Sequence, residues 1–231
     1  MPRKSPDALL TALRAKLAAA GDATRASAMQ AYMKSAMPYH GVPAAGVRAI
    51  CKQLFAGLAL PDRAAWERAV RAIWDGARFR EERYAAIALS GVRAARAHQT
   101  PESMALYEHI VVTGAWWDYV DDVATHRVGP ILLAHPRPTR ALMLRWARGR
   151  DMWKARTAII CQARARERTD LELLYACIEP SIGAKEFFLR KAIGWALREY
   201  AYVDPKEVAR YVKKNESRLS GLSKREALKH V

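Results

Sequence analysis

Apolar residues recur along most of the chain at intervals of three and four, which is the repeat of an amphipathic α-helix. Near the start, Leu9, Leu13 and Leu17 mark one such face. Ser5 followed by Pro6 is a typical N-cap with a first-turn proline. Long runs of alternating apolar and polar residues, which mark strands, are nearly absent. The pattern predicts an all-α protein.

Turn and capping signals divide this pattern into about a dozen helices. Asp22, Asp62 and Asp204 are typical N-caps, because a carboxylate there accepts a hydrogen bond from a free backbone amide. Ser223 and Glu226 have the spacing of a capping box and predict the start of the last helix. The helices are expected to start near Pro6, Asp22, Pro43, Pro61, Pro101, Trp116, Met152, Leu171, Phe187, Pro205 and Ser223, with two more over 84–92 and 142–146.

Helices of this length joined by short turns favour antiparallel pairs stacked as a superhelical solenoid of the HEAT kind, with about 40 residues per repeat. The repeat is not visible as strict self-similarity of the sequence, and a compact helical bundle is the alternative architecture. We expect one domain over residues 1–231. Stacked pairs would leave a concave groove.

Positive charge is the main compositional feature of the chain. There are 39 Lys and Arg residues against 23 Asp and Glu residues, which gives a net charge of +16. Such an excess destabilises a compact fold by self-repulsion unless a partner uses it. Nucleic acid is the first candidate partner and an anionic membrane surface the second. Because the excess is spread along the chain, it fits a basic groove better than a basic arm.

Metal and redox chemistry have little support in the sequence. Cys51, Cys161 and Cys177 are few, odd in number and far apart, which is typical of small core residues in a reduced cytoplasmic protein. The histidines lack metal-ligand spacing, and glycine-rich phosphate loops are missing. The N-terminus has no continuous apolar run typical of a signal peptide or a membrane span. We therefore expect a cytoplasmic protein with no cofactor.

The stretch with the strongest chemical character is 116–122, which places two indoles and three carboxylates in seven residues. Trp117 and Asp121 are four apart and share a face of a helix that we expect to continue to about Leu133. An aromatic ring beside a carboxylate suits a cationic guest. The alternative is that the tryptophans belong to the core and the aspartates are solvated or cap a helix.

Two further groups combine cations with aromatic side chains. Arg156 follows Trp153 and Lys154. Lys191, Trp195 and Arg198 share one helical face, opposite an apolar stripe, which favours a ligand or nucleic-acid surface over plain core. Other arginines are candidates for phosphate contacts, although each one alone is more typical of a solvated surface. They are Arg145, Arg148, Arg150, Arg164, Arg166 and Arg168.

Five stretches resemble the DNA alkylation repair glycosylases of the AlkD type. They are AYMK at 31–34, WWDYVD at 116–121, WKARTAI at 153–159, FFLRKAIGWALREY at 187–200 and LSKREALKH at 222–230. The resemblance covers almost the whole chain in one order, and the run at 187–200 is highly specific. It implies a superhelix of HEAT-like repeats. It also implies removal of 3-alkyl and 7-alkyl purines from duplex DNA without a metal or other cofactor.

Carried over by position, the resemblance implies that Asp121 is the catalytic carboxylate. It implies that Trp117 and Trp195 are aromatic walls of the site and that Arg156 is its arginine. The implied partner is double-stranded DNA containing alkylated purines, with no membrane and no obligate protein partner, and we expect a monomer. The expected DNA contacts are Tyr32, Arg148, Lys154, Arg190, Lys191 and Arg198.

The sequence departs from the family pattern at two positions. Ala155 stands where a second arginine is expected, which weakens a possible phosphate contact. Asp122 adds a carboxylate beside Asp121, and we expect this neighbour to raise the pKa of either group if both are desolvated. A non-catalytic HEAT-like module that binds nucleic acid or a protein is the alternative function, since a fold alone does not define an activity.

Overall fold

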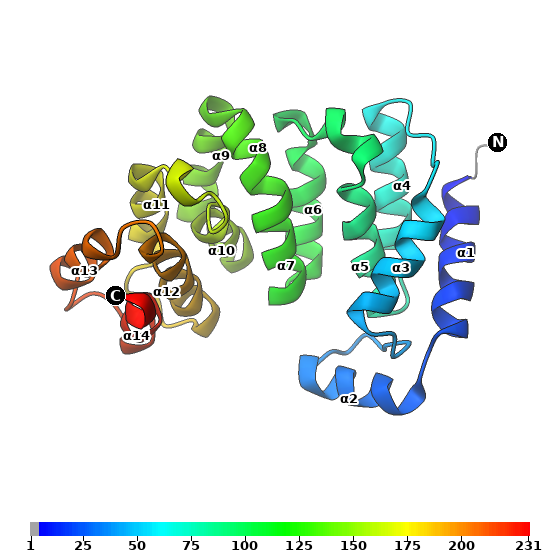
Figure 1. Ribbon diagram of the computed structural model, residues 1–231, viewed down its shortest axis with the longest axis horizontal. Coiled ribbons are helices and arrows are strands. Elements are labelled where there is room, and N and C mark those ends of the chain that lie inside the picture. Colours follow the sequence, from blue (N-terminus) through cyan, green and yellow to red (C-terminus); the bar gives the residue numbers. More distant parts are fainter. Residues whose placement is uncertain (1–4) are drawn as a thin grey trace. The chain divides into compact units, whose positions relative to one another are not determined.

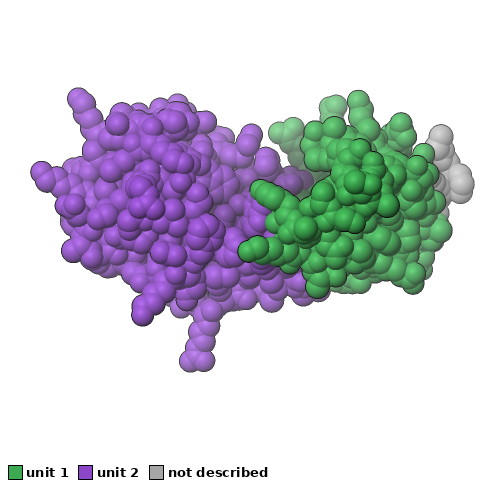
Figure 2. All heavy atoms as spheres, turned by 90° about the horizontal axis from the view of Figure 1, so that it is seen from below, with its two compact units in different colours: residues 1–99 green, residues 100–231 purple. Residues whose placement is uncertain are grey.

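A computed structural model describes residues 5–231, which form 14 α-helices, several short 3₁₀ turns and one π-helix, with no strand among them (Figure 1). The all-α prediction is therefore confirmed. The chain divides into two compact units, residues 1–99 and 100–231 (Figure 2). The single domain expected from the sequence stays a prediction. Within the described residues, no helix is both long and apolar enough to cross a membrane.

The first unit is a stack of helices around a core of aliphatic and tryptophan side chains. Its elements are α1 (Pro6–Ala19), α2 (Ala23–Met33), α3 (Ala44–Phe55), α4 (Arg63–Asp75), α5 (Arg80–Ser90) and the 3₁₀ turn Arg93–His98. Helices α1, α3, α4 and α5 pack against one another. Trp66 and Trp74 of α4 are almost fully buried in that core. Helix α2 contributes only Met33 to the buried set.

The capping signals in the sequence mark these helices correctly. The side chains of Ser5, Asp22 and Asp62 accept hydrogen bonds from the backbone amides three residues on. Helix α5 ends at Ser90, so Val92, which was expected on its face, lies outside it.

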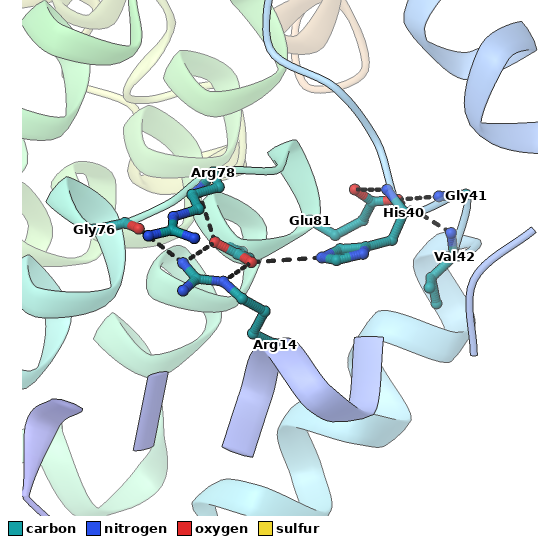
Figure 3. Close-up of polar contacts among 8 residues, drawn as sticks. Arg14, His40, Gly41, Val42, Gly76, Arg78 and Glu81 are labelled. Carbon is teal, nitrogen blue, oxygen red and sulfur yellow. Dashed lines mark hydrogen bonds and ion pairs between the residues drawn. The ribbon is translucent and has the colours of Figure 1, made fainter. Parts of the chain in front are cut away.

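Two buried glutamates in the first turn of α5 connect the helices of this unit (Figure 3). The carboxylate of Glu81 accepts hydrogen bonds from the amides of His40, Gly41 and Val42, at 3.0, 2.8 and 3.1 Å. These three amides belong to the loop between α2 and α3. Gly41 has φ of 84°, and a Cβ there would lie 2.0 Å from the carbonyl oxygen of Asp22, so this tight loop requires glycine.

Glu82 ties α1 to α5 through a bidentate contact. Its carboxylate accepts from Arg14 Nε at 2.8 Å and Nη2 at 3.0 Å, and from the amide of Arg78 at 2.7 Å. Burial acts to raise the pKa of Glu82, but the Arg14 and Arg78 hydrogen bonds outweigh it and leave the pKa lowered. A buried carboxylate of this kind is tolerated because its charge is paired and its oxygens are hydrogen-bonded.

The second unit contains the remaining helices in consecutive packed layers. They are α6 (Met104–Gly114), α7 (Trp117–Val123), α8 (Gly129–Ala134), α9 (Pro136–Arg148), α10 (Met152–Ile160), α11 (Leu171–Ile178), α12 (Phe187–Ala201), α13 (Pro205–Lys214) and α14 (Gly221–Ala227). Helix α10 packs against α6, α7, α9, α11 and α12, which makes it the central helix of this unit.

The helix expected from Trp116 to about Leu133 is present, but a π-helix over Ala124–Val128 interrupts it between α7 and α8. Pro130 has no amide hydrogen, and its ring would crowd a carbonyl one turn earlier, so a wider turn accommodates it. Gly129 allows a close approach to α10, because a Cβ there would lie 2.2 Å from the carbonyl oxygen of Cys161.

The capping box expected at Ser223 and Glu226 is wrong. Helix α14 begins two residues earlier, at Gly221, and Ser220 is its N-cap, whose hydroxyl accepts from the amide of Ser223 at 3.0 Å. Ser223 and Glu226 are buried inside the helix, where they contact α12. Local spacing alone could not separate a capping pair from two polar residues that serve a tertiary contact.

All three cysteines are free and buried, as the sequence predicts. Burial raises the pKa of the Cys51 and Cys177 thiols to about 12, and it raises that of Cys161 well above the ordinary value.

We expect Glu81→Gln to destabilise the protein by about 1–3 kcal/mol, because the amide group offers only one acceptor oxygen to three buried backbone donors. The measurement is the free energy of unfolding in urea. Glu67→Gln is the matched control, since Glu67 makes only a 3.6 Å ion pair with Arg63 on the surface of α4. Equal losses in the two variants would contradict the anchoring role of Glu81.

Candidate active site

Three helices of the second unit carry the residues of the candidate site. Trp117 and Asp121 lie on α7, Arg156 on α10, and Trp195 on α12. Helix α10 packs against both α7 and α12. Its start is defined by Asp151, whose carboxylate accepts from the amides of Trp153 and Lys154 at 2.9 and 2.8 Å.

A bidentate ion pair joins Arg156 and Asp121. Arg156 Nε donates to Asp121 Oδ1 at 2.7 Å and Nη2 donates to Oδ2 at 2.8 Å. The third guanidinium nitrogen, Nη1, donates to the carbonyl oxygen of Phe188 at 2.6 Å. The arginine side chain is 6% exposed and the aspartate side chain 18% exposed. The pair therefore connects all three helices while one edge of the carboxylate remains open to solvent.

Burial is the main influence on the acidity of Asp121. It raises the pKa of this carboxyl above its ordinary value, the negative charge of Asp118 adds to the rise, and the hydrogen bonds and charge of Arg156 oppose it. Each carboxylate oxygen has a second lone pair beyond the one that Arg156 uses. Asp121 can therefore face a positive charge on its open edge while Arg156 holds its orientation.

The pKa of Asp122 is lowered, whereas the sequence led us to expect a raised value. Burial acts to raise its pKa, but a hydrogen bond to His126 and the charges of Arg127, His126 and Arg164 outweigh burial and lower it. The carboxylate that raises the pKa of Asp121 is Asp118, one helical turn away, and Asp122 does not contribute. Neighbours in sequence point in different directions on a helix, which is why Asp118 matters and Asp122 does not.

An aromatic cluster that the sequence analysis did not identify as a unit lies against the ion pair. Trp116, Trp153 and Phe188 have ring centroids 4.9–6.3 Å apart, and Phe187 packs edge-on against Phe188 at 5.4 Å. The guanidinium carbon of Arg156 lies 5.9 Å from the Phe188 ring centre. The cluster shields one side of the ion pair from water, which strengthens the attraction between its charges. In the sequence, the adjacent Phe187 and Phe188 were the feature that could have indicated this cluster.

The two tryptophans assigned to the walls of the site are both half-buried. Trp117 stands one helical turn before Asp121 on α7. Trp195 donates its indole N–H to Glu199 at 3.1 Å, which restricts the rotation of its ring. Each side chain thus keeps an exposed ring surface on a helix that also contacts α10.

The expected DNA-contacting residues fall into three groups. Tyr32 is 77% exposed on α2, and Arg148 is exposed at the end of α9. Lys154, Lys191 and Arg198 instead form ion pairs, Lys154 with Glu108 at 2.8 Å and the other two with Glu226. The side chain of Arg190 is half-buried and its Nε has no hydrogen-bond partner within the described residues.

Helix α14 holds α12 in place next to Trp195, a role that the sequence analysis missed. Gly194 allows the contact, because a Cβ there would lie 2.5 Å from the Cβ of Glu226 and 3.0 Å from the carbonyl oxygen of Ser223. Ser223 donates its hydroxyl to the carbonyl of Arg190 at 2.9 Å. Figure 1 shows the two helices side by side at the C-terminal end of the chain.

Glu226 is the centre of charge in this contact. Its carboxylate accepts from Arg198 at 2.6 Å and from Lys229 at 2.8 Å, and it lies 3.2 Å from Lys191. The hydrogen bond from Lys229 and the contacts with Lys191 lower the pKa of Glu226 to about 2. Two of the cations expected to contact DNA are thus balanced by one carboxylate.

Stacked helices that hold a carboxylate, an arginine and half-exposed tryptophans together define an all-α protein with a carboxylate-centred site. A family model for DNA alkylation repair enzymes matches residues 13–231, and the chain belongs to that family. The family resemblance noted from the sequence is thereby confirmed, and the chain is an enzyme of DNA repair.

A solved structure supports the same assignment. The chain is similar to a protein described as a predicted DNA alkylation repair enzyme from Enterococcus faecalis, with 28% identity and a TM-score of 0.83. The match covers 91% of this chain and 96% of that one. No curated protein matches the sequence.

We expect Glu226→Gln to lower stability at neutral pH by about 1–3 kcal/mol, because charge-assisted hydrogen bonds are lost. The folded pKa of about 2 lies below the ordinary 4.5, so the contribution of the carboxylate is complete above 4.5 and is lost as the pH falls towards 2. Urea unfolding over this pH range should show the wild type converging on the variant. A constant difference, or the same effect in Glu167→Gln at an exposed position, would contradict this linkage.

Proposed function

We propose that the protein is a DNA glycosylase of base excision repair that hydrolyses the N-glycosidic bond of 3-alkyl and 7-alkyl purines in duplex DNA. The observation that carries the proposal is the buried Arg156–Asp121 pair with an open carboxylate edge. Membership of the DNA alkylation repair family supports alkylated DNA as the substrate.

Alkylation at N3 or N7 gives the purine a positive charge and makes it a good leaving group. The glycosidic C–N bond breaks with its electron pair moving to the base, and the deoxyribose becomes oxocarbenium-like. Water then adds to the anomeric carbon and passes a proton to the carboxylate of Asp121, which releases it to solvent. The difficult species is therefore a sugar cation, and a fixed negative charge is the group that stabilises it.

Asp121 has the properties that this step needs. Arg156 fixes both of its oxygens, so the carboxylate requires little reorganisation when the cation forms. Partial burial excludes water and increases the attraction between the carboxylate and the sugar. The raised pKa of Asp121 also makes its carboxylate a better acceptor for the proton of the attacking water.

The tryptophans and the net charge complete the proposed site. Trp117 and Trp195 would pack on the deoxyribose and stabilise its positive charge through their ring faces. The excess of Lys and Arg, with a net charge of +16, would hold the DNA backbone without reading sequence. Exposed residues such as Tyr32 and Arg148 would contribute to that grip.

The test of this function is base release from methylated duplex DNA by the wild type and by Asp121→Asn. Asn keeps the shape of the side chain and removes its charge, so we expect release to fall by ~100-fold or more. DNA binding should be retained or tightened, because the charge of Arg156 is no longer neutralised. Released bases are quantified by chromatography, and binding is measured on the same DNA.

Two outcomes would contradict the proposal. If Asp121→Asn releases base as fast as the wild type, the carboxylate is not the electrostatic centre. If neither protein releases 3-methyladenine or 7-methylguanine while both bind DNA in a salt-dependent way, the chain is a non-catalytic binding module.

The pH dependence of base release provides a separate test of the site. Because Asp121 acts in its ionised form, activity should fall as the pH drops through its raised pKa. Asp118→Asn removes a charge that raises this pKa, so the acid limb of the single-turnover rate should move to lower pH. Asp122→Asn is the matched control and should leave the limb in place. A shift in the control variant alone would overturn this account.

A further inference from the structure

A hollow of about 460 Å³ lies on the second unit beside the π-helix. It is lined by residues of the π-helix and α8 on one side and by the segment after α10 on the other. Its basic residues are His126, Arg127, Arg164 and Arg168, and we call it the arginine pocket. The pocket falls within the size range of small-molecule sites and exceeds what a single water needs.

Arg164 and Arg168 differ from the arginines of this unit that are held in ion pairs. Arg140, Arg156, Arg198, Arg210 and Arg218 each form an ion pair with a carboxylate. The side chains of Arg164 and Arg168 are exposed and have no hydrogen-bond or ion-pair partner among the residues that the structure describes. Asp122 interacts electrostatically with Arg164 but makes no ion pair with it, so both guanidinium groups remain available to an anionic partner or to solvent.

The electrostatic field around the pocket is positive. The hydrogen bond from His126 and the charges of Arg127, His126 and Arg164 together lower the pKa of Asp122. Asp122 lies within this field, and its carboxylate is 3.1 Å from His126. Arg127 also donates to the carbonyl of His126 at 3.0 Å, which restrains its side chain near the rim.

The walls of the pocket are closely packed and continue the helix that carries Asp121. Gly129 lets α8 approach the Cys161 carbonyl closely. The hydroxyl of Thr125, another lining residue, donates to the carbonyl of Asp121 at 2.8 Å. Four to six residues separate Asp121 from the π-helix residues of the pocket, which corresponds to about 6–9 Å along a helix. A DNA strand rises about 3.4 Å per nucleotide, so this span covers about one to three nucleotides.

We propose that the arginine pocket binds a phosphodiester of the DNA strand, about one to three nucleotides from the alkylated base. This proposal rests on the proposed function for the position of the base. Arg164 and Arg168 supply the charge, and Arg127 and His126 complete the rim. A phosphate fixed at this point sets the register of the strand, so that the sugar of the damaged nucleotide faces Asp121.

The first experiment compares the salt dependence of DNA binding. Each phosphate contact contributes about 0.9 to the slope of log K against log salt concentration. The double variant Arg164→Gln/Arg168→Gln should therefore lower the slope by about 0.9 on duplex DNA. Arg210→Gln/Arg218→Gln is the matched control, because it removes the same charge from guanidinium groups already paired with Glu207 and Glu179. An equal decrease in both double variants, or no decrease in the first, would overturn the proposal.

The second experiment locates the phosphate. Duplexes carry a tetrahydrofuran abasic analogue and a single neutral methylphosphonate at successive positions from it. Wild-type affinity should fall by several-fold when the neutral linkage lies about one to three nucleotides away. The Arg164→Gln/Arg168→Gln variant should show no such loss at that position. A loss that is the same in both proteins, or that never depends on position, would overturn the assignment.

Two further readouts separate the possible sources of failure. Calorimetric binding of inorganic phosphate that is lost in the double variant, without any methylphosphonate effect, would assign the pocket to a free anion and overturn the DNA assignment. Base release by the wild type with unchanged salt slopes would overturn the pocket and leave the glycosylase function in place. A reduced slope with no base release by the wild type would support the pocket and overturn the function.

Discussion

The bidentate contact between Arg156 and Asp121 is the interaction on which the second unit and its site depend. Removing either partner would leave a charge in a largely buried position, which is far more costly than the net value of the pair. The pair spans α7, α10 and α12, because Arg156 also binds the Phe188 carbonyl. The same contact therefore holds three helices together and presents a negative charge at a defined place.

The surroundings of this pair show how packing supports chemistry. The Phe188 ring lies 5.9 Å from the Arg156 guanidinium carbon and packs with Trp116 and Trp153, so aromatic side chains lie beside the arginine. Helix α14 presses on α12 at Gly194, beside Trp195. The C-terminal helix thus supports the helix that carries Trp195, although its own side chains need not contact a substrate.

Sequence reasoning succeeded where the signal is local. N-caps such as Ser5 and Asp22 act within three residues, and the helical repeat of apolar residues follows from burial of one face. Spacing could not reveal the pairing of Arg156 with Asp121, because the two residues are far apart in sequence. A resemblance to known enzymes put them in one site, and the structure supplies the geometry.

Sequence reasoning failed where a polar residue serves a distant partner. Ser223 and Glu226 have the spacing of a capping box, but their hydrogen bonds go to α12. Nothing in the sequence indicated that the carboxylate of Glu81 would accept hydrogen bonds from three backbone amides of a loop about forty residues away. The pKa of Asp122 depends on charges brought close by folding, so adjacency to Asp121 was a poor guide.

The burial of the three thiols has a consequence for a protein that belongs to an alkylation repair family. Agents that methylate DNA also attack protein nucleophiles, and the thiolate is the most reactive of these. With a pKa of about 12, the Cys51 and Cys177 thiols are ionised at neutral pH to only about one part in 10⁵. The fold therefore keeps these thiols in their unreactive protonated form, away from the kind of compound whose damage its family repairs.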